Sequence, residues 1–177
     1  MRLRSDWHCV AGIYFTADRK LSVVWLGHDK QKDTVHVFDS VTLQHRAAPV
    51  VMAERINAGN RRWLPIAWFK SSADLAEKLS ICGCNMEPEP VDETDAKMET
   101  LVASFEERLI SERIKVDKDL QAWSEEYKTL RFQDNKFPKE TYPLMAATLC
   151  AFAQLDYARK RPRRHQVKGN YPKVAIV

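Results

Sequence analysis

Cysteine is the residue type in this chain that first suggests chemistry. There are four cysteines, and only Cys82 and Cys84 lie close together, as a Cys-x-Cys pair. A tetrahedral zinc site needs four ligands, and neither a second pair nor a cluster of histidines supplies the other two. We therefore predict reduced thiols in or near an apolar core, and no zinc site.

Positive charge is the second chemical feature, and it is concentrated at the C-terminus. Of the 28 Lys and Arg residues, seven lie from Arg159 onward without any acid, which leaves 21 against 24 Asp and Glu in the rest. A basic arm on a mildly acidic body is typical of contact with nucleic acid or an acidic protein surface, and a solubilising tail is the alternative. The candidate binding residues of the arm are Arg159, Lys160, Arg161, Arg163, Arg164 and Lys168.

A second basic group precedes a buried strand. The run Asn60-Arg61-Arg62-Trp63 combines two guanidinium groups with an aromatic ring, as a contact with phosphate would. A solvated loop has the same composition, so both interpretations of Arg61 and Arg62 stay open.

Length and composition predict one domain with a core. The chain has 177 residues, of which 45% are hydrophobic, and we divide it into a domain at 1–158 and a basic tail at 159–177. No apolar run approaches the roughly 20 residues of a membrane span, and the polar N-terminus lacks the apolar stretch of a signal peptide. We expect a cytoplasmic protein that does not contact the membrane.

The first half of the sequence predicts a sheet. Residues 7–16, 21–27 and 34–40 have the composition of strands joined by polar turns, and in the third run Val35, Val37 and Asp39 are expected on one face. A helix is expected from Pro49 to Asn57. Residues 64–69 are wholly apolar, as in a strand buried on both faces.

The second half predicts mostly helices. A helix capped by Ser71 or Ser72 precedes a possible edge strand at residues 85–87. A long helix follows Thr94 or Asp95. Another helix begins near Asp117, and the last runs from an N-cap at Thr141 to about residue 158. This order predicts an α/β fold, in which an antiparallel meander and a parallel strand form a mixed sheet flanked by helices.

These segments, taken in order, resemble the nuclease domain of phage large terminases, which has a ribonuclease-H-like fold. The likeness extends from Ile66 to about residue 158, and it lies in a strand and helix (IAWFKSSADLAEKL), a glycine-led step (GCNMEP), a long helix (KMETLVASFEERLISERIKV) and two last segments (DLQAWSEEYKTLRF and ETYPLMAATLCAFA). The phosphate-binding loop of the terminase ATPase, G-x-x-x-x-G-K-[ST], is absent from this sequence. The resemblance implies a role in viral or prophage DNA packaging.

The resemblance also implies a two-metal nuclease site, and its acidic positions are replaced here. Such a site holds its metal ions with carboxylates from the first strand, the buried parallel strand and the last helix. The matching positions hold Tyr14, Trp68, Tyr142 and Ala146, none of which binds Mg²⁺ or Mn²⁺ as a carboxylate does. The nearest acids are Asp18, Asp74 and Glu140, and Glu140 is the nearest to a usable position.

Three hypotheses follow. The first is a terminase-nuclease-like domain without catalysis or cofactor, which binds double-stranded DNA, the portal or procapsid, or another terminase component. The second is an active Mg²⁺- or Mn²⁺-dependent endonuclease with displaced ligands, which requires at least two carboxylates at the C-terminal edge of the central strands. The third is a protein-interaction module of a mobile element. The aromatic replacements either fill the former metal cavity or form a stacking surface.

Overall fold

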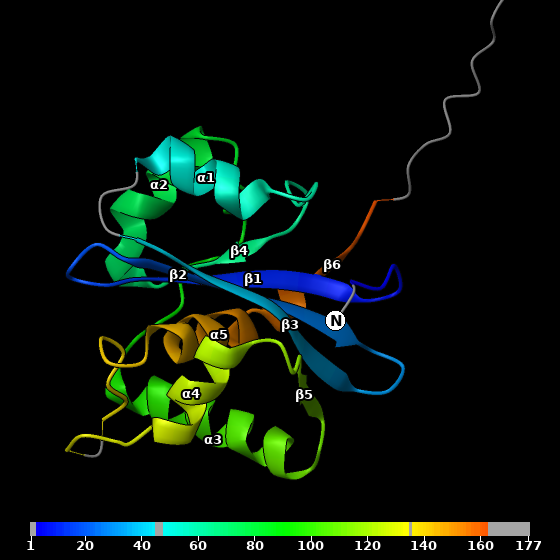
Figure 1. Cartoon of the computed structure of the whole chain (residues 1–177), viewed down its shortest axis with the longest axis vertical. Coiled ribbons are helices and arrows are strands. Elements are labelled where there is room, and N and C mark those ends of the chain that lie inside the picture. Colours follow the sequence, from blue (N-terminus) through cyan, green and yellow to red (C-terminus); the bar gives the residue numbers. More distant parts are fainter. Residues whose placement is uncertain (1–2, 45–47, 135, 163–177) are drawn as a thin grey trace, which may run out of the picture.

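Six strands form one mixed sheet at the centre of the molecule (Figure 1). The structure, a computed structural model, describes residues 3–44, 48–134 and 136–162. The strand order is β4-β1-β2-β3-β5, with β6 beside the start of β1. The strands are β1 (His8–Phe15), β2 (Leu21–Asp29), β3 (Thr34–Leu43), β4 (Ile66–Ala67), β5 (Ile114–Val116) and β6 (Arg159–Lys160).

The first three strands form the antiparallel meander that the sequence predicts. A bulge in β3 leaves Asp39, and not Phe38, opposite Trp25 of β2. The expectation that Asp39 shares a face with Val35 and Val37 is therefore wrong, because one extra residue in a strand reverses the side-chain alternation beyond it.

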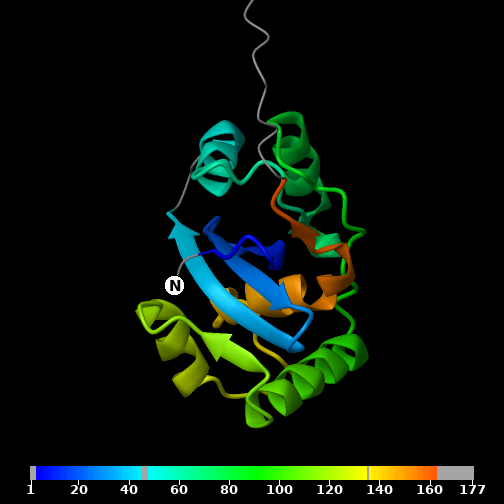
Figure 2. The ribbon, with the colours of Figure 1, turned by 90° about the vertical axis from the view of Figure 1, so that its right-hand side faces the viewer.

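Helices cover both faces of the sheet, as Figures 1 and 2 show. On one face lie α1 (Pro49–Asn57) and α2 (Ala73–Ile81), and on the other α3 (Asp95–Ile110), α4 (Gln121–Thr129) and α5 (Pro143–Ala153). β4 pairs in parallel with β1, and β5 pairs in parallel with β3. The predicted fold class, a mixed sheet flanked by helices, is confirmed. No helix in the described ranges combines the length and hydropathy needed to cross a membrane.

The apolar helix α5 packs directly against the centre of the sheet. Nine of its residues are buried. A Cβ atom on Gly12 of β1 would lie 2.0 Å from the carbonyl oxygen of Ala147 and 2.6 Å from the nitrogen of Ala151. Only glycine allows the helix and the strand to come this close. This contact holds the middle of α5 against β1.

The long helix α3 has the buried stripe that its sequence predicts. Met98, Val102 and Phe105 are buried, and Leu101 and Leu109 pack against the same core. The helix therefore lies along the outer side of the layer that contains α5, with its polar residues facing solvent.

Both ends of the last helix differ from the expectation. The N-cap is Tyr142 rather than Thr141, and the helix ends at Ala153 instead of near residue 158. A single 3-10 turn (η2, Leu155–Tyr157) then turns the chain back, and Arg159 and Lys160 pair with β1. The sheet thus includes the first two residues of the predicted tail. Pairing with β1 satisfies backbone hydrogen-bonding groups at the sheet edge, which a longer α5 would leave without these partners.

Two other predictions, a helix start and a short strand, were also wrong. The helix expected from Asp117 begins four residues later, at Gln121. Residues 85–87 form no strand, although the carbonyl of Asn85 accepts a hydrogen bond of 2.8 Å from the nitrogen of Ile66. The parallel bridge to this part of the sheet comes later, between Phe69 and Val91. A short 3-10 turn, η1 (Lys70–Ser72), leads from there into α2.

Candidate functional site

The carboxyl ends of β1 and β4 lie side by side, and this is where a ribonuclease-H-like fold would hold its metal ions. Gly12 of β1 lies opposite Ala67 of β4 in a parallel register. The residues two positions further on, Tyr14 and Phe69, face the same core, and their rings meet edge to face with centroids 5.9 Å apart. Two aromatic side chains therefore fill the space at these strand ends.

Trp68, which the sequence placed at this site, lies on the opposite face of the sheet. It packs against the core formed with α1 and α2, and its indole nitrogen donates a hydrogen bond of 2.9 Å to the carbonyl of Pro88. Phe69 is the residue beside Tyr14. Side chains alternate along a strand, so the pairing of Gly12 with Ala67 puts Tyr14 and Phe69, each two residues further on, on the same face. That pairing forms only in the tertiary structure, so the sequence alone does not identify Phe69.

Tyr142 and Ala146 lie at the start of α5. Ala146 is fully buried in the core that also contains Tyr14. The hydroxyl of Tyr142 donates a hydrogen bond of 2.7 Å to the carbonyl of Thr129, which ties the start of α5 to the end of α4. These two side chains serve packing and helix connection in this structure.

Glu140 lies beside Tyr14, although 126 positions separate them in the chain. The hydroxyl of Tyr14 donates a hydrogen bond of 2.6 Å to Oε1 of Glu140, and the backbone nitrogen of Ala17 donates one of 3.0 Å to Oε2. Both carboxylate oxygens of Glu140 are thus engaged. The segment between α4 and α5 brings this acid to the carboxyl end of β1.

A second carboxylate, Glu93, lies near enough to Tyr14 to act on it electrostatically. It forms an ion pair of 2.6 Å with Lys139, and the backbone nitrogen of Ser71 donates a hydrogen bond of 2.9 Å to it. The side chains of Glu93 and Lys139 are 13% and 25% exposed, so the pair is largely shielded from solvent. The Lys139 ammonium also lies 5.7 Å from the centroid of the Phe69 ring. Sequence reasoning missed this pair, since no pattern along the chain links the two positions.

The electrostatics of the site favour a neutral Tyr14 and an ionised Glu93. Burial, the hydrogen bond to Glu140 and the charges of Glu140 and Glu93 raise the pKa of Tyr14. Burial alone would raise the pKa of Glu93, but the hydrogen bonds from Lys139 and Ser71 outweigh it and lower that pKa overall. In the described part of the chain, no three or more His, Cys, Asp or Glu side chains are grouped to hold a metal ion. The residues at these strand ends therefore do not fit a two-metal centre as they stand.

The four cysteines are free thiols. Burial raises the pKa of Cys9 to about 12 and the pKa of Cys84 to about 11, the latter with a smaller contribution from Cys82. A thiol with a raised pKa is a poor nucleophile and a poor metal ligand at neutral pH.

Two of the predicted basic residues in the described ranges, Arg61 and Arg159, are already ion-paired. The guanidinium of Arg61 lies 4.6 Å above the Trp25 ring and forms an ion pair of 2.6 Å with Asp39. Arg159 forms an ion pair with Glu87. Of the other predicted basic residues, Arg62, Lys160 and Arg161 are exposed and have no ion pair in the described ranges, whereas Arg163, Arg164 and Lys168 lie outside the described residues.

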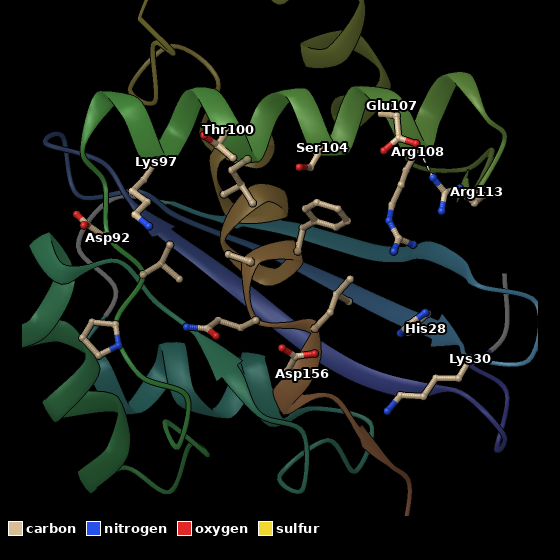
Figure 3. Close-up of a pocket in the computed structure, with 17 residues that line it drawn as sticks. His28, Lys30, Asp92, Lys97, Thr100, Ser104, Glu107, Arg108, Arg113 and Asp156 are labelled. Atoms are coloured by element: carbon tan, nitrogen blue, oxygen red, sulfur yellow. Dashed lines mark hydrogen bonds and ion pairs between the residues drawn. The ribbon is translucent and has the colours of Figure 1, made fainter.

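A groove of about 770 Å³ runs along α3 (Figure 3). Arg108 points from α3 into the groove, with Lys97 near one end and His28 and Lys30 near the other. Asp33, which is not one of the lining residues, accepts hydrogen bonds from Arg108 and Arg113, and Arg113 also pairs with Glu107. Both of these cations in the groove are therefore already ion-paired. The groove is therefore lined by side chains of both charges and by apolar side chains.

Three nuclease domains of known structure are similar to this chain. The nuclease domain of the P22 large terminase superposes with a TM-score of 0.79 over 90% of this chain and 87% of that domain, at 16% identity. The chain has the fold of a large-terminase nuclease domain. The SPP1 large-terminase nuclease, solved with bound Mn, gives a TM-score of 0.63 at 17% identity over 83% of this chain and 86% of that one.

The third is the large-terminase nuclease of thermophilic phage G20c, solved with bound zinc. Its TM-score is 0.62 at 16% identity, over 85% of this chain and 83% of that one. No protein-family model matches the sequence, and no curated protein sequence is similar to it. The similarity is therefore one of fold, which the comparison reveals at sequence identities too low for sequence searches to detect.

Proposed function

We propose that this chain is a terminase-nuclease-like domain of viral or prophage DNA packaging that binds DNA or a packaging partner without cleaving DNA. The observation that carries the proposal is the pair of aromatic rings, Tyr14 and Phe69, at the carboxyl ends of β1 and β4. The SPP1 and G20c domains of the same fold bind metal ions. Here Tyr14 and Phe69 occupy the strand ends at which the resemblance predicts carboxylate ligands.

The chemistry of the nearby acids supports the same proposal. Two-metal cleavage of a phosphodiester needs several carboxylates free to bind divalent cations. Glu140 is occupied by Tyr14 and Ala17, and Glu93 by Lys139 and Ser71. A metal ion would have to displace a lysine and a phenol at the same time, which costs the hydrogen bonds that both acids now make.

Cleavage of supercoiled plasmid tests this proposal. Purified full-length protein is incubated with Mg²⁺ or Mn²⁺, with EDTA in a parallel reaction, and nicked and linear products are measured on a gel. We expect no EDTA-sensitive nicking. Nicking that persists through repurification and disappears with EDTA would contradict the proposal.

A second function, metal-dependent endonuclease, has one specific observation in its favour. Glu140 accepts a hydrogen bond from Tyr14, and Glu93 pairs with Lys139, whose ammonium lies 5.7 Å from the centroid of the Phe69 ring, so two carboxylates lie near the carboxyl ends of β1 and β4. If nicking is seen, the single variants Glu93→Gln and Glu140→Gln decide whether these acids support it. Loss of nicking in both variants, with the fold intact, would establish this second function.

The proposed partners are double-stranded DNA, the portal or procapsid and other terminase components, in the cytoplasm of a bacterial host. Lys160, Arg161 and the basic residues that follow supply the positive charge for contact with phosphates. A chain that ends after Pro162 keeps the strand β6 and removes the later basic residues. We expect its DNA affinity to fall and its dependence on salt to weaken.

Full DNA affinity in the shortened chain would place the contact on the folded domain instead. If neither chain binds DNA, the packaging partner is a protein, and the interaction-module hypothesis gains support. The outcome thus separates the tail, the domain and a protein partner as sources of binding.

A further inference from the structure

A second cavity, of about 630 Å³, lies at the same strand ends but on the opposite face of the sheet from Tyr14. It is bounded by the β1–β2 turn, the start of α1 and one side of α2. Phe15, Met52 and Leu75 give it an apolar wall, and Arg19, Ser72 and Lys78 add polar groups. Pockets that bind small molecules have volumes of roughly 300–1,000 Å³ and combine apolar walls with a few polar groups.

The β1–β2 turn leaves one cation available to this cavity. Lys20 forms an ion pair of 3.1 Å with Asp18, and the hydroxyl of Thr16 is hydrogen-bonded to the same carboxylate. The nitrogen of Arg19 donates a hydrogen bond of 2.9 Å to the carbonyl of Thr16, which fixes the turn. Arg19 lines the cavity, and its guanidinium has no ion pair with any described residue.

Across the cavity, α2 contributes a second cation and an acid. Lys78 lines the cavity and has no ion pair within the described ranges, and Asp74 lies one helical turn before it. The cavity therefore carries two cations and one carboxylate, an excess of one positive charge. This balance favours an anionic ligand whose remaining part donates a hydrogen bond near Asp74.

Ser72 provides an unused hydrogen-bonding group. The residue is only 7% exposed and lines the cavity, yet its hydroxyl makes no hydrogen bond with the described residues. Its own backbone nitrogen is occupied by the carbonyl of Phe69, and the nitrogen of Ser71 by Glu93. The Ser72 oxygen is not among the buried polar atoms that lack a partner in the described residues, so it reaches the solvent of the cavity and is free to bond a ligand there.

We propose that this cavity binds the phosphate of a nucleotide. The phosphate lies between Arg19 and Lys78 and accepts a hydrogen bond from the hydroxyl of Ser72, while the sugar or base packs on Phe15. A guanidinium and an ammonium are the usual protein partners of phosphate, and an aromatic ring is a suitable surface for a base. The inference does not depend on whether the domain cleaves DNA.

Titration of the full-length protein with 2′-deoxyadenosine 5′-monophosphate (dAMP) tests the proposal. Binding is measured by calorimetry and by changes in the amide NMR shifts. We expect saturable binding, with shifts centred on Ser72 and the β1–β2 turn. Arg19→Gln is expected to weaken binding roughly tenfold, as the loss of a charge-assisted hydrogen bond does. The matched control is Lys20→Gln, which removes the same charge from the same turn and leaves the affinity within about twofold.

The source of the phosphate is identified with short single-stranded oligonucleotides. Binding that requires a 5′-phosphate on the oligonucleotide would assign the cavity to a DNA end, and binding of dAMP alone would assign it to a free nucleotide. An equal loss in Arg19→Gln and Lys20→Gln would overturn the proposal. So would the absence of saturable dAMP binding by a protein with an unchanged melting temperature.

Discussion

The hydroxyl of Tyr14, near the end of β1, donates a hydrogen bond of 2.6 Å to the carboxylate of Glu140, just before α5. In a ribonuclease-H-like nuclease this strand end would supply a carboxylate to a metal ion, and here a phenol engages the nearest carboxylate instead. The bond joins the meander to the segment that leads into the last helix. It therefore links the first strand and the segment before the last helix at the carboxyl ends of β1 and β4.

The variant Tyr14→Phe is expected to lower the free energy of unfolding by about 1–2 kcal/mol, because it leaves a carboxylate oxygen of Glu140 without its partly buried donor. Urea denaturation measures the change. Tyr142→Phe is the matched control, since its hydroxyl bonds an exposed backbone carbonyl, and it should lose less. Equal losses in the two variants would show that the hydrogen bond to Glu140 contributes no more to stability than the exposed hydrogen bond of Tyr142.

Tyr14→Asp is expected to create a site that responds to metal. The new acid would lie beside Glu93 and Glu140, so repulsion between the carboxylates and the loss of the ring should lower the melting temperature. Millimolar Mn²⁺ should then raise the melting temperature of this variant and leave the parent unchanged, because only the variant binds the ion in its folded state.

The control for the metal response is Tyr14→Asn, which removes the same ring without adding a charge. We expect no stabilisation of this variant by Mn²⁺. Stabilisation of the parent protein to the same extent as Tyr14→Asp would indicate that the native acids already bind metal. That outcome would favour the endonuclease hypothesis.

Lys139→Met is expected to destabilise the fold by about 1–2 kcal/mol at neutral pH, because it leaves the largely buried Glu93 carboxylate without its cation. Lys136→Met is the control, since the pair of Lys136 with Asp95 is 64% and 68% exposed and such pairs contribute little. Thermal unfolding of both variants provides the comparison. A loss in Lys136→Met as large as in Lys139→Met would contradict the argument from burial.

The same pair gives a pH dependence. Because the pKa of Glu93 is lowered in the folded protein, its contribution to stability is complete above the ordinary pKa of a glutamate and is lost as the pH falls through the lowered value. Denaturation at a series of acidic pH values measures this loss. We expect a shallower acidic slope in Lys139→Met, and an unchanged slope would show that Lys139 does not set the pKa.

Gly12→Ala is expected to cost about 3 kcal/mol or more, because the added methyl group would meet the backbone of α5, which cannot rotate away as a side chain can. Gly83→Ala has open space around the new methyl group and should cost only about 1 kcal/mol, from its φ of 88°. Chemical denaturation of both variants tests the comparison. If Gly12→Ala were as mild as Gly83→Ala, α5 would not rest against β1 as closely as described.

Local patterns predicted the elements of this fold well. The stripe of Met98, Val102 and Phe105 depends only on the helical period, and the meander depends only on strand composition and turns. The ends of elements were less predictable. Thr141 and residues near 158 have sequences compatible with helix, but the pairing of Arg159 with Cys9 of β1 draws the chain away from α5.

The sequence by itself determined the α/β class, the order of the elements, the absence of a carboxylate at Tyr14 and the basic charge of the C-terminal residues. Only the tertiary structure decided that Phe69 rather than Trp68 lies beside Tyr14, and that Glu140 and Glu93 converge there. The physical reason is range: periodicity acts over a few residues and fixes which side of an element is apolar. Neighbours 126 positions apart depend on strand register and on the path of the segment between α4 and α5, which form only when the whole core packs.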